Sequence, residues 1–236
     1  MAAIVIETPP AAEPLSLAEV KLHLGLGPWQ DSDHVTSANL ATRLRDLIYA
    51  AREYCSTFTR RAFVNTGFCQ YLDSFPYYTD TVMSQQTYPP AYYGLPRYST
   101  TLWNYSQMIK LFYSPLVSVS SISYIATDGS TQTLEPGTPG NQDGDFVIDT
   151  ASEPPRLFPN SGQYWPPCLY VPNAVAIHFT AGYGANGSSV PAVVKVAMRH
   201  LIRLWDADPS LIGKKNPEVE RLLWSARVLD ISPTRG

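Results

Sequence analysis

The chain has 236 residues, enough for one large domain or two small ones with a buried core. Its 17 Lys and Arg against 20 Asp and Glu give a net charge of -3, which excludes a strongly basic protein that holds nucleic acid by neutralising phosphates. Only 16% of the residues are charged, while 12% are aromatic. Such a composition favours contacts with other proteins, because interfaces are rich in aromatic residues and poor in Lys and Glu.

The three cysteines, Cys55, Cys69 and Cys168, are far apart and form no CxxC pair. This spacing indicates neither a zinc site nor a disulfide framework, so we expect synthesis in a reducing compartment. The N-terminus has no basic start followed by an apolar run, and no stretch of about 18 apolar residues occurs. We therefore expect no signal peptide and no membrane contact.

The first 61 residues are predicted to be helical. Ser16 and Glu19 have the spacing of a capping box, the apolar residues Val20, Leu22 and Leu24 follow, and Gly25 is a typical stop. A longer helix is predicted from about residue 33 to 58. Its apolar stripe recurs every three or four residues: Leu40, Leu44, Leu47, Ile48, Ala51, Tyr54, Cys55 and Phe58.

Residues 62–190 are predicted to form strands, and they hold three basic and eight acidic residues. The expected strands cover 63–72, 109–113, 118–125, 131–134, 145–149 and 174–180. Asp128-Gly129 predicts a hairpin turn between two of them. In the last strand, Val175, Ile177 and Phe179 are expected to share one face.

Helical periodicity returns at Pro191, a residue suited to the first helical position, and is expected to end at Asp208-Pro209. The expected apolar face consists of Val193, Val194, Ala197, Met198, Leu201, Ile202 and Trp205. A last helix, about 217–229, is expected to bury Val219, Leu222, Leu223 and Val228. The sequence thus predicts an α+β fold: residues 1–61 and 191–236 form a helical bundle, and residues 62–190 form a β-rich insert that projects as a wing.

No group of residues indicates catalysis. The histidines, His23, His34, His178 and His200, show no metal-ligand spacing, and the acidic residues Asp143, Asp145 and Asp149 lack the pattern of a calcium loop. The glycines of 182–184 follow a strand and precede a helix, as in phosphate-binding loops, but without the P-loop lysine. We interpret them as a flexible connection between the β-rich insert and the helical bundle, and we expect no enzyme activity, no metal and no cofactor.

Two features are candidate partner-binding surfaces. The first is the Tyr/Pro-rich segment 76–107, in which only Asp80 and Arg97 are charged. Its candidate contact residues are Tyr77, Tyr78, Tyr92, Tyr93 and Trp103. Because Tyr and Pro give contact area at low entropic cost, this segment is either a docking loop or a long loop packed on its own wing. Carbohydrate stacking on these rings is a further alternative.

The second candidate is the basic stripe, defined as Lys195, Arg199 and Arg203, which recur every four residues along one helix face. Either the stripe is a solvated basic face, or it faces a neighbouring subunit or nucleic acid.

Several segments together resemble the tailed-bacteriophage head–tail connector (adaptor) family. In order, they are Glu13-Pro-Leu-Ser-Leu-Ala-Glu-Val-Lys-Leu-His-Leu24, residues 47–63 with their Thr-Phe-Thr turn, residues 110–129 with Ser-Pro-Leu-x-Ser-Val-x-Ser-Ile, and Phe179-Thr-Ala-Gly-Tyr-Gly184 followed by Val190-Pro191 and a helix. The resemblance spans about residues 13–206. Residues 76–107 and the tail after 207 match no pattern of this family.

The resemblance implies a structural virion protein rather than an enzyme. Family members form a homo-oligomeric ring, commonly of twelve copies, between the portal protein and a tail-side stopper or tail protein. Such a ring extends the DNA channel, so contact with packaged DNA would be transient and non-specific. The implied location is the head–tail junction of a virion, with assembly in the host bacterial cytoplasm. The alternatives are a carbohydrate-binding or host-contact β-domain and a small hydrolase.

Overall fold

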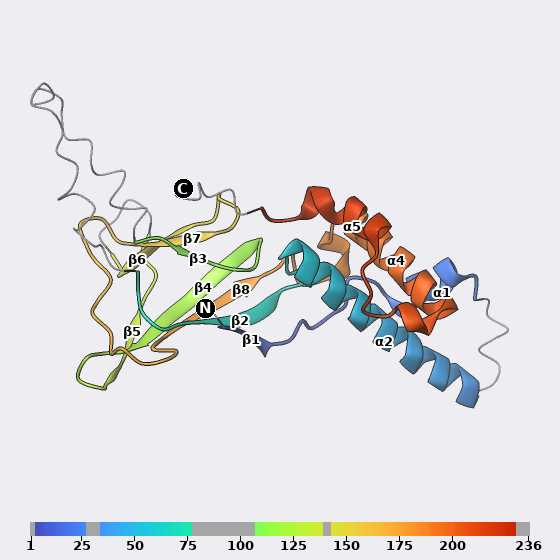
Figure 1. Cartoon of the computed structure of the whole chain (residues 1–236), viewed down its shortest axis with the longest axis horizontal. Coiled ribbons are helices and arrows are strands. Elements are labelled where there is room, and N and C mark those ends of the chain that lie inside the picture. Colours follow the sequence, from blue (N-terminus) through green and yellow to red (C-terminus); the bar gives the residue numbers. More distant parts are fainter. Residues whose placement is uncertain (1–2, 27–33, 77–106, 139–142, 230–236) are drawn as a thin grey trace, which may run out of the picture. The chain divides into compact units, whose positions relative to one another are not determined.

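The computed structural model describes residues 3–26, 34–76, 107–138 and 143–229 (Figure 1). Its α-helices are α1 (Leu17–Leu24), α2 (His34–Thr59), α4 (Ala192–Ala207) and α5 (Pro217–Leu223). Its strands are β1 (Ala3–Thr8), β2 (Thr66–Leu72), β3 (Ile109–Lys110), β4 (Leu116–Ile125), β5 (Thr131–Leu134), β6 (Phe146–Asp149), β7 (Arg156–Pro159) and β8 (Val175–Ala181). Helices and antiparallel strand pairs in one chain confirm the predicted α+β class.

The strands form two sheets, with the orders β1-β2-β8-β4-β5 and β3-β7-β6. The hairpin predicted at Asp128-Gly129 is present, since β4 and β5 pair antiparallel with Ile122 opposite Leu134. Two strand predictions need correction. The strand expected over 63–72 begins only at Thr66, and that expected over 109–113 is limited to Ile109–Lys110. The short strands β1 and β7 were not predicted from the sequence.

The chain divides into two compact units. Unit 1 comprises Met1–Val5, Cys69–Leu111 and Val119–Phe179, and unit 2 comprises Ile6–Phe68, Phe112–Ser118 and Thr180–Gly236. The strands β1, β2, β4 and β8 each begin in one unit and end in the other. From the sequence, the boundaries between the helical bundle and the β-rich insert were placed at residues 61 and 190, where the helical and strand periodicities change. These boundaries stay a prediction.

The core of unit 2 is built by helices. The capping box is present, because the side chain of Ser16 accepts from the backbone N–H of Glu19 and the carboxylate of Glu19 accepts from the N–H of Ser16. Gly25 ends α1 in a left-handed conformation, with φ of 73°. The apolar stripes of α2 and α4 pack against each other, and α1 and α5 contact both helices.

Several residues expected on apolar helix faces are exposed. Leu22 is 82% exposed, Val193 44% and Leu222 43%, because the buried stripe of each helix is narrower than the run of apolar residues. Pro191 is the N-cap of α4 rather than its first helical residue. The last helix is also shorter than expected: α5 ends at Leu223, and a 3-10 turn covers Trp224–Ala226.

The core of unit 1 is built around an aromatic stack. The rings of Phe75 and Trp165 lie 5.0 Å apart and are almost parallel, while Phe146 packs 6.3 Å from the same Trp165 ring. The indole N–H of Trp165 donates to the carbonyl of Gln107 at 2.7 Å. The burial of β8 alternates as predicted: Val175, Ile177 and Phe179 are buried. Partners far apart in the chain therefore hold this unit together.

Candidate partner-binding surfaces

The basic stripe has two different ends in the structure. Lys195 and Arg199 are half-buried, whereas Arg203 is exposed. The guanidinium of Arg199 lies 3.4 Å from Oε1 of Glu19, which belongs to α1. Part of the positive charge of the stripe is therefore offset within the chain, and Arg203 is its exposed end. The sequence predicted the face but not this acidic partner.

The ionisation of Glu19 reflects these contacts. Its pKa is lowered, first by the hydrogen bond from the backbone N–H of Ser16 and then by the positive charges of Lys195 and Arg199. The capping box thus stabilises the ionised carboxylate of Glu19 at the start of α1, and this carboxylate also attracts the basic stripe.

A hollow of about 610 Å³ lies beside this pair. It is lined by the segment 12–17 together with Glu19, Arg45, Ile48 and Lys195. Glu13, at its margin, forms an ion pair with Arg52 at 2.9 Å. Burial nevertheless raises the pKa of Glu13, because desolvation disfavours its charged form more than the charge and hydrogen bond of Arg52 stabilise it. Apolar side chains and charges of both signs line the hollow, and no sequence pattern predicted it.

A second group of residues in unit 2 combines arginines with aromatic rings. The guanidinium of Arg227 lies 5.0 Å from the centre of the Phe58 ring and 5.3 Å from that of Trp224. The guanidinium of Arg60 lies 5.0 Å from the Phe112 ring. We call Phe58, Arg60, Phe112, Trp224 and Arg227 the arginine–aromatic surface. Two of its rings are well exposed, Trp224 at 55% and Phe112 at 39%.

The backbone brings these residues together around the end of α2. Arg60 follows α2 with a left-handed φ of 55°, and its carbonyl accepts from the N–H of Ser114. The N–H of Val228 donates to the carbonyl of Thr59 at 2.9 Å, which holds the backbone next to Arg227 at the end of α2. Since the three segments are distant in sequence, the periodicities could not reveal this surface.

The predicted Tyr/Pro-rich contact residues lie outside the described residues: Tyr77, Tyr78, Tyr92, Tyr93 and Trp103. Their role as a docking loop stays a prediction. Only the ends of the segment are described, and there Gln107 is buried as the acceptor for Trp165.

The acidic residues considered for calcium have local partners. Asp149 forms an ion pair with Arg156 at 2.5 Å; burial raises its pKa, but hydrogen bonds from Ser152 and Arg156 outweigh burial and lower it overall. Asp145 accepts from the backbone N–H of Glu135 at 2.9 Å, and Asp143 from that of Thr138 at 3.2 Å.

The glycine-rich connection at 182–184 is explained by close packing of the backbone. Gly182 has a φ of +152°, and a Cβ at this position would lie 2.5 Å from the backbone nitrogen of Asn65. Its N–H donates to the carbonyl of Pro115. A side chain cannot be accommodated there, so the glycine serves packing within unit 2.

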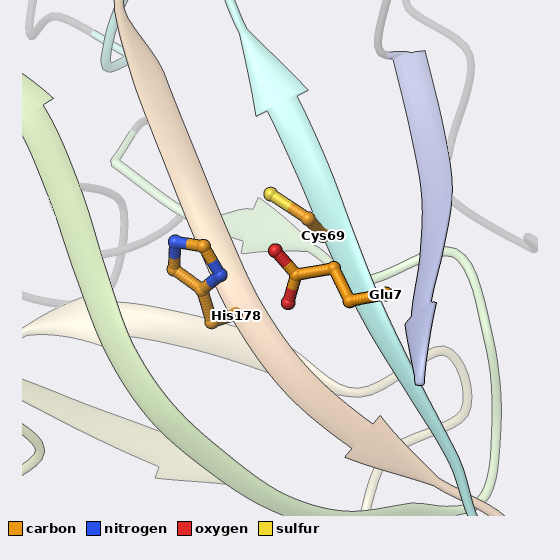
Figure 2. A group of neighbouring side chains, drawn as sticks. All are labelled: Glu7, Cys69 and His178. Carbon is orange, nitrogen blue, oxygen red and sulfur yellow. The ribbon is translucent and has the colours of Figure 1, made fainter. Parts of the chain in front are cut away.

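Two potential metal ligands lie close together in unit 1. The thiol of buried Cys69, on β2, and the ring of His178, on β8, are within 4.8 Å of each other (Figure 2). The Nε2 atom of His178 also lies 3.5 Å from the Ser123 hydroxyl. The third side chain drawn, Glu7, belongs to unit 2. Two donors are fewer than the three or four protein ligands that zinc sites use, so this pair carries no metal assignment.

None of the helices in the described part of the chain is both long and apolar enough to cross a membrane.

Comparison with known proteins shows similarity at the level of the fold. No model of a known protein family matches the chain, and no curated protein sequence does. A chain of the virion of a native gene transfer agent (GTA) particle is similar over 99% of both chains, with a TM-score of 0.64 and 19% identity.

Two further solved structures are similar over the whole length of both chains, each at 20% identity. One is described as the neck of the empty GTA particle computed with C6 symmetry, with a TM-score of 0.63. The other is described as the neck of the native GTA particle computed with C12 symmetry, with a TM-score of 0.58. At this level of identity, the similarity establishes that the chain has the same fold as these chains.

Proposed function

We propose that this protein is a structural component of the neck of a phage-like particle. The observation that carries the proposal is the likeness to GTA virion and neck chains, which extends over 99–100% of both chains rather than over one motif. The segments between residues 13 and 206 that resemble the head–tail adaptor family support it independently. In this role the protein has no catalytic task.

The proposed assembly is a homo-oligomeric ring of twelve copies between the portal protein and a tail-side stopper or tail protein. The symmetry of the similar neck structures, C6 and C12, supports a cyclic arrangement. A cyclic ring of identical chains needs two different surfaces on each copy, because every copy contacts its neighbours head to tail. The ring continues the DNA channel, and the helical bundle with a projecting β-rich wing is the arrangement that we propose for each copy.

The basic stripe is proposed to face the channel or an adjoining subunit. Its exposed end, Arg203, and the half-buried Lys195 offer weak, salt-sensitive attraction to phosphates or to acidic groups of a neighbour. Replacing Lys195, Arg199 and Arg203 with Gln is expected to lower the yield of DNA-retaining particles, most clearly at high salt. Particle yield and morphology equal to wild type at every salt concentration would mean that the stripe is an ordinary solvated face.

The Tyr/Pro-rich segment is proposed to be a contact between proteins. Replacing residues 77–106 by a short Gly/Ser bridge is expected to leave soluble, folded protein but to impair ring or tail assembly, because this low-charge segment gives the contact area. Loss of folded protein on deletion would instead show that the segment completes the core of unit 1.

Association with the portal protein tests the proposed function. The purified 26.1-kDa chain is mixed with purified portal protein, and the mass of the complex is measured by mass photometry. The proposal predicts a complex heavier than the portal by twelve times the mass of the chain. Failure to bind the portal, or binding of a single copy, would contradict it.

A further inference from the structure

We propose that the arginine–aromatic surface docks the acidic group of a second copy of this chain, defined as Glu135, Asp143 and Asp145. This inference rests on the proposed ring, and it names the two surfaces that would meet between neighbouring copies. One surface belongs to unit 2 and the other to unit 1, so the contact is head to tail, as a closed ring requires.

The composition of the arginine–aromatic surface favours binding to a protein. Trp and Arg are the residue types most enriched among those that dominate binding energy at interfaces. Trp224, more than half exposed, and the adjacent Arg227 form such a pair, and Phe112 with Arg60 forms another. Stacking on the rings also fixes the guanidinium planes before binding, which reduces the entropy lost in forming a contact.

The positive charge of the arginine–aromatic surface also favours an acidic partner. Within the described part of the chain, neither Arg60 nor Arg227 contacts a carboxylate, although other arginines of unit 2 do: Arg43 with Asp206, Arg52 with Glu13 and Arg199 with Glu19. Both cations lie near the C-terminal end of α2, where the helix dipole favours them. The dipole explains their position, but it leaves their hydrogen-bond donors available to a carboxylate.

The acidic group that matches this surface lies in unit 1. Residues 62–190 hold eight acidic and three basic residues, and Glu135, Asp143 and Asp145 are all exposed. The hydrogen bonds from the backbone of Glu135 and from Thr138 hold Asp145 and Asp143 in place at the start of β6. Each carboxylate still has acceptor capacity for an arginine, since its two oxygens can accept about four hydrogen bonds. In the described residues, no cation forms an ion pair with any of the three.

Packaged DNA fits this surface less well than protein does. Bases in a duplex are stacked on one another, so exposed Trp and Phe rings cannot stack on them, and phosphate contacts alone need no aromatic residues. A protein segment uses both components, with carboxylates on the guanidiniums and apolar side chains against the rings.

The test uses charge reversal with rescue. The variant R60E/R227E keeps a Cβ at the left-handed position of Arg60, so its backbone cost is unchanged. The variant E135K leaves the hydrogen bonds accepted by Asp143 and Asp145 in place. The variant K214E/K215E is the matched control, because it makes the same charge change at exposed residues of unit 2. Thermal melts of all variants establish that they fold.

Ring assembly with the portal protein is measured by mass photometry over a range of concentrations. R60E/R227E and E135K are each expected to raise the concentration for half-assembly about tenfold or more, while K214E/K215E does not. Mixing R60E/R227E with E135K is expected to restore assembly, because alternating copies place Glu against Lys at one interface and Arg against acid at the next.

Three outcomes would overturn the inference. If R60E/R227E assembles like wild type, this surface is not the subunit contact, although the proposed function stands. If its assembly is unchanged but its binding to a DNA duplex is weakened, the surface faces DNA. If wild type itself forms no ring with the portal, the proposed function fails and this inference fails with it.

Discussion

The two units of the chain build their buried cores from different kinds of contact. In unit 2, most of the buried residues lie on helices, where apolar side chains recur every three or four positions. In unit 1, the aromatic stack contains Phe75 and Trp165, which are 90 positions apart. The carbonyl of Gln107, which lies between these two residues in the sequence, accepts from the indole N–H of Trp165. The core residues of unit 2 can therefore be recognised from local sequence patterns. The core of unit 1 depends on contacts between residues that are distant in sequence and meet only in the folded chain.

This difference governs what a mutation does. Truncation in the helical core leaves a cavity among many apolar neighbours, whereas truncation of Trp165 in the aromatic stack also leaves the carbonyl of Gln107 without its donor.

Removal of Trp205 is expected to have the largest effect. Its side chain is 2% exposed and meets Tyr54 edge-on at 6.1 Å in the core of unit 2. Trp205→Ala is expected to lower the free energy of unfolding by about 3–5 kcal/mol. The measurement is urea denaturation followed by circular dichroism. Trp224→Ala is the control, because Trp224 is 55% exposed and its loss is expected to cost about 1 kcal/mol or less. Equal effects at the two tryptophans would contradict the assignment of this core.

In unit 1, Trp165→Phe separates the hydrogen bond from the stack. The ring on Phe75 is kept, but the carbonyl of Gln107 loses its donor. We expect a loss of about 1–3 kcal/mol in the free energy of unfolding, since a buried acceptor is left unpaired. Trp224→Phe, at an exposed site, is the matched control. A cost no greater than that of the control would show that the hydrogen bond adds nothing to this core.

The capping box of α1 gives a smaller effect. Ser16→Ala removes the acceptor for the Glu19 N–H and is expected to cost about 1 kcal/mol, measured by thermal unfolding. Ser188→Ala makes the same change at an exposed serine and is expected to be neutral. If the two variants melt alike, α1 does not depend on its cap.

The pKa values of the two carboxylates beside the hollow, Glu13 and Glu19, are expected to be shifted in opposite directions. Burial raises the pKa of Glu13 above 4.5, so its folded form holds a proton more tightly, and stability falls as the pH rises through this range. The hydrogen bond from Ser16 lowers the pKa of Glu19 below 4.5, so its stabilisation is present above 4.5 and is lost as the pH falls through the folded pKa. Carboxyl NMR titration measures both values. A pKa of Glu13 equal to or lower than that of Glu19 would contradict the burial assigned to Glu13 and the hydrogen bond assigned to Glu19.

The same difference between the units explains what could be predicted from sequence. The capping box at Ser16 and the stop at Gly25 are local patterns, and both were predicted correctly. The apolar stripe of α4 is also local, and it was predicted correctly except for the exposed Val193. The edge strand β1 and the four-residue β7 carry no alternation long enough to detect, and a strand forms there because of its pairing in the sheet.

The candidate surfaces follow the same logic. The basic stripe could be predicted because its members share one helix. Its partner Glu19 could not, since α1 and α4 are separated by 180 positions at the Arg199 contact. The arginine–aromatic surface joins residues from three distant segments, Phe58, Phe112 and Trp224 among them, so no window of sequence contains it.

The measurement that tests the central claim most directly is electron cryomicroscopy of particles carrying this protein, with the chain traced in the map. The account predicts that the chain occupies the neck in cyclically arranged copies, with unit 2 of one copy against unit 1 of the next. A chain absent from the neck, or present there as a single copy, would contradict it.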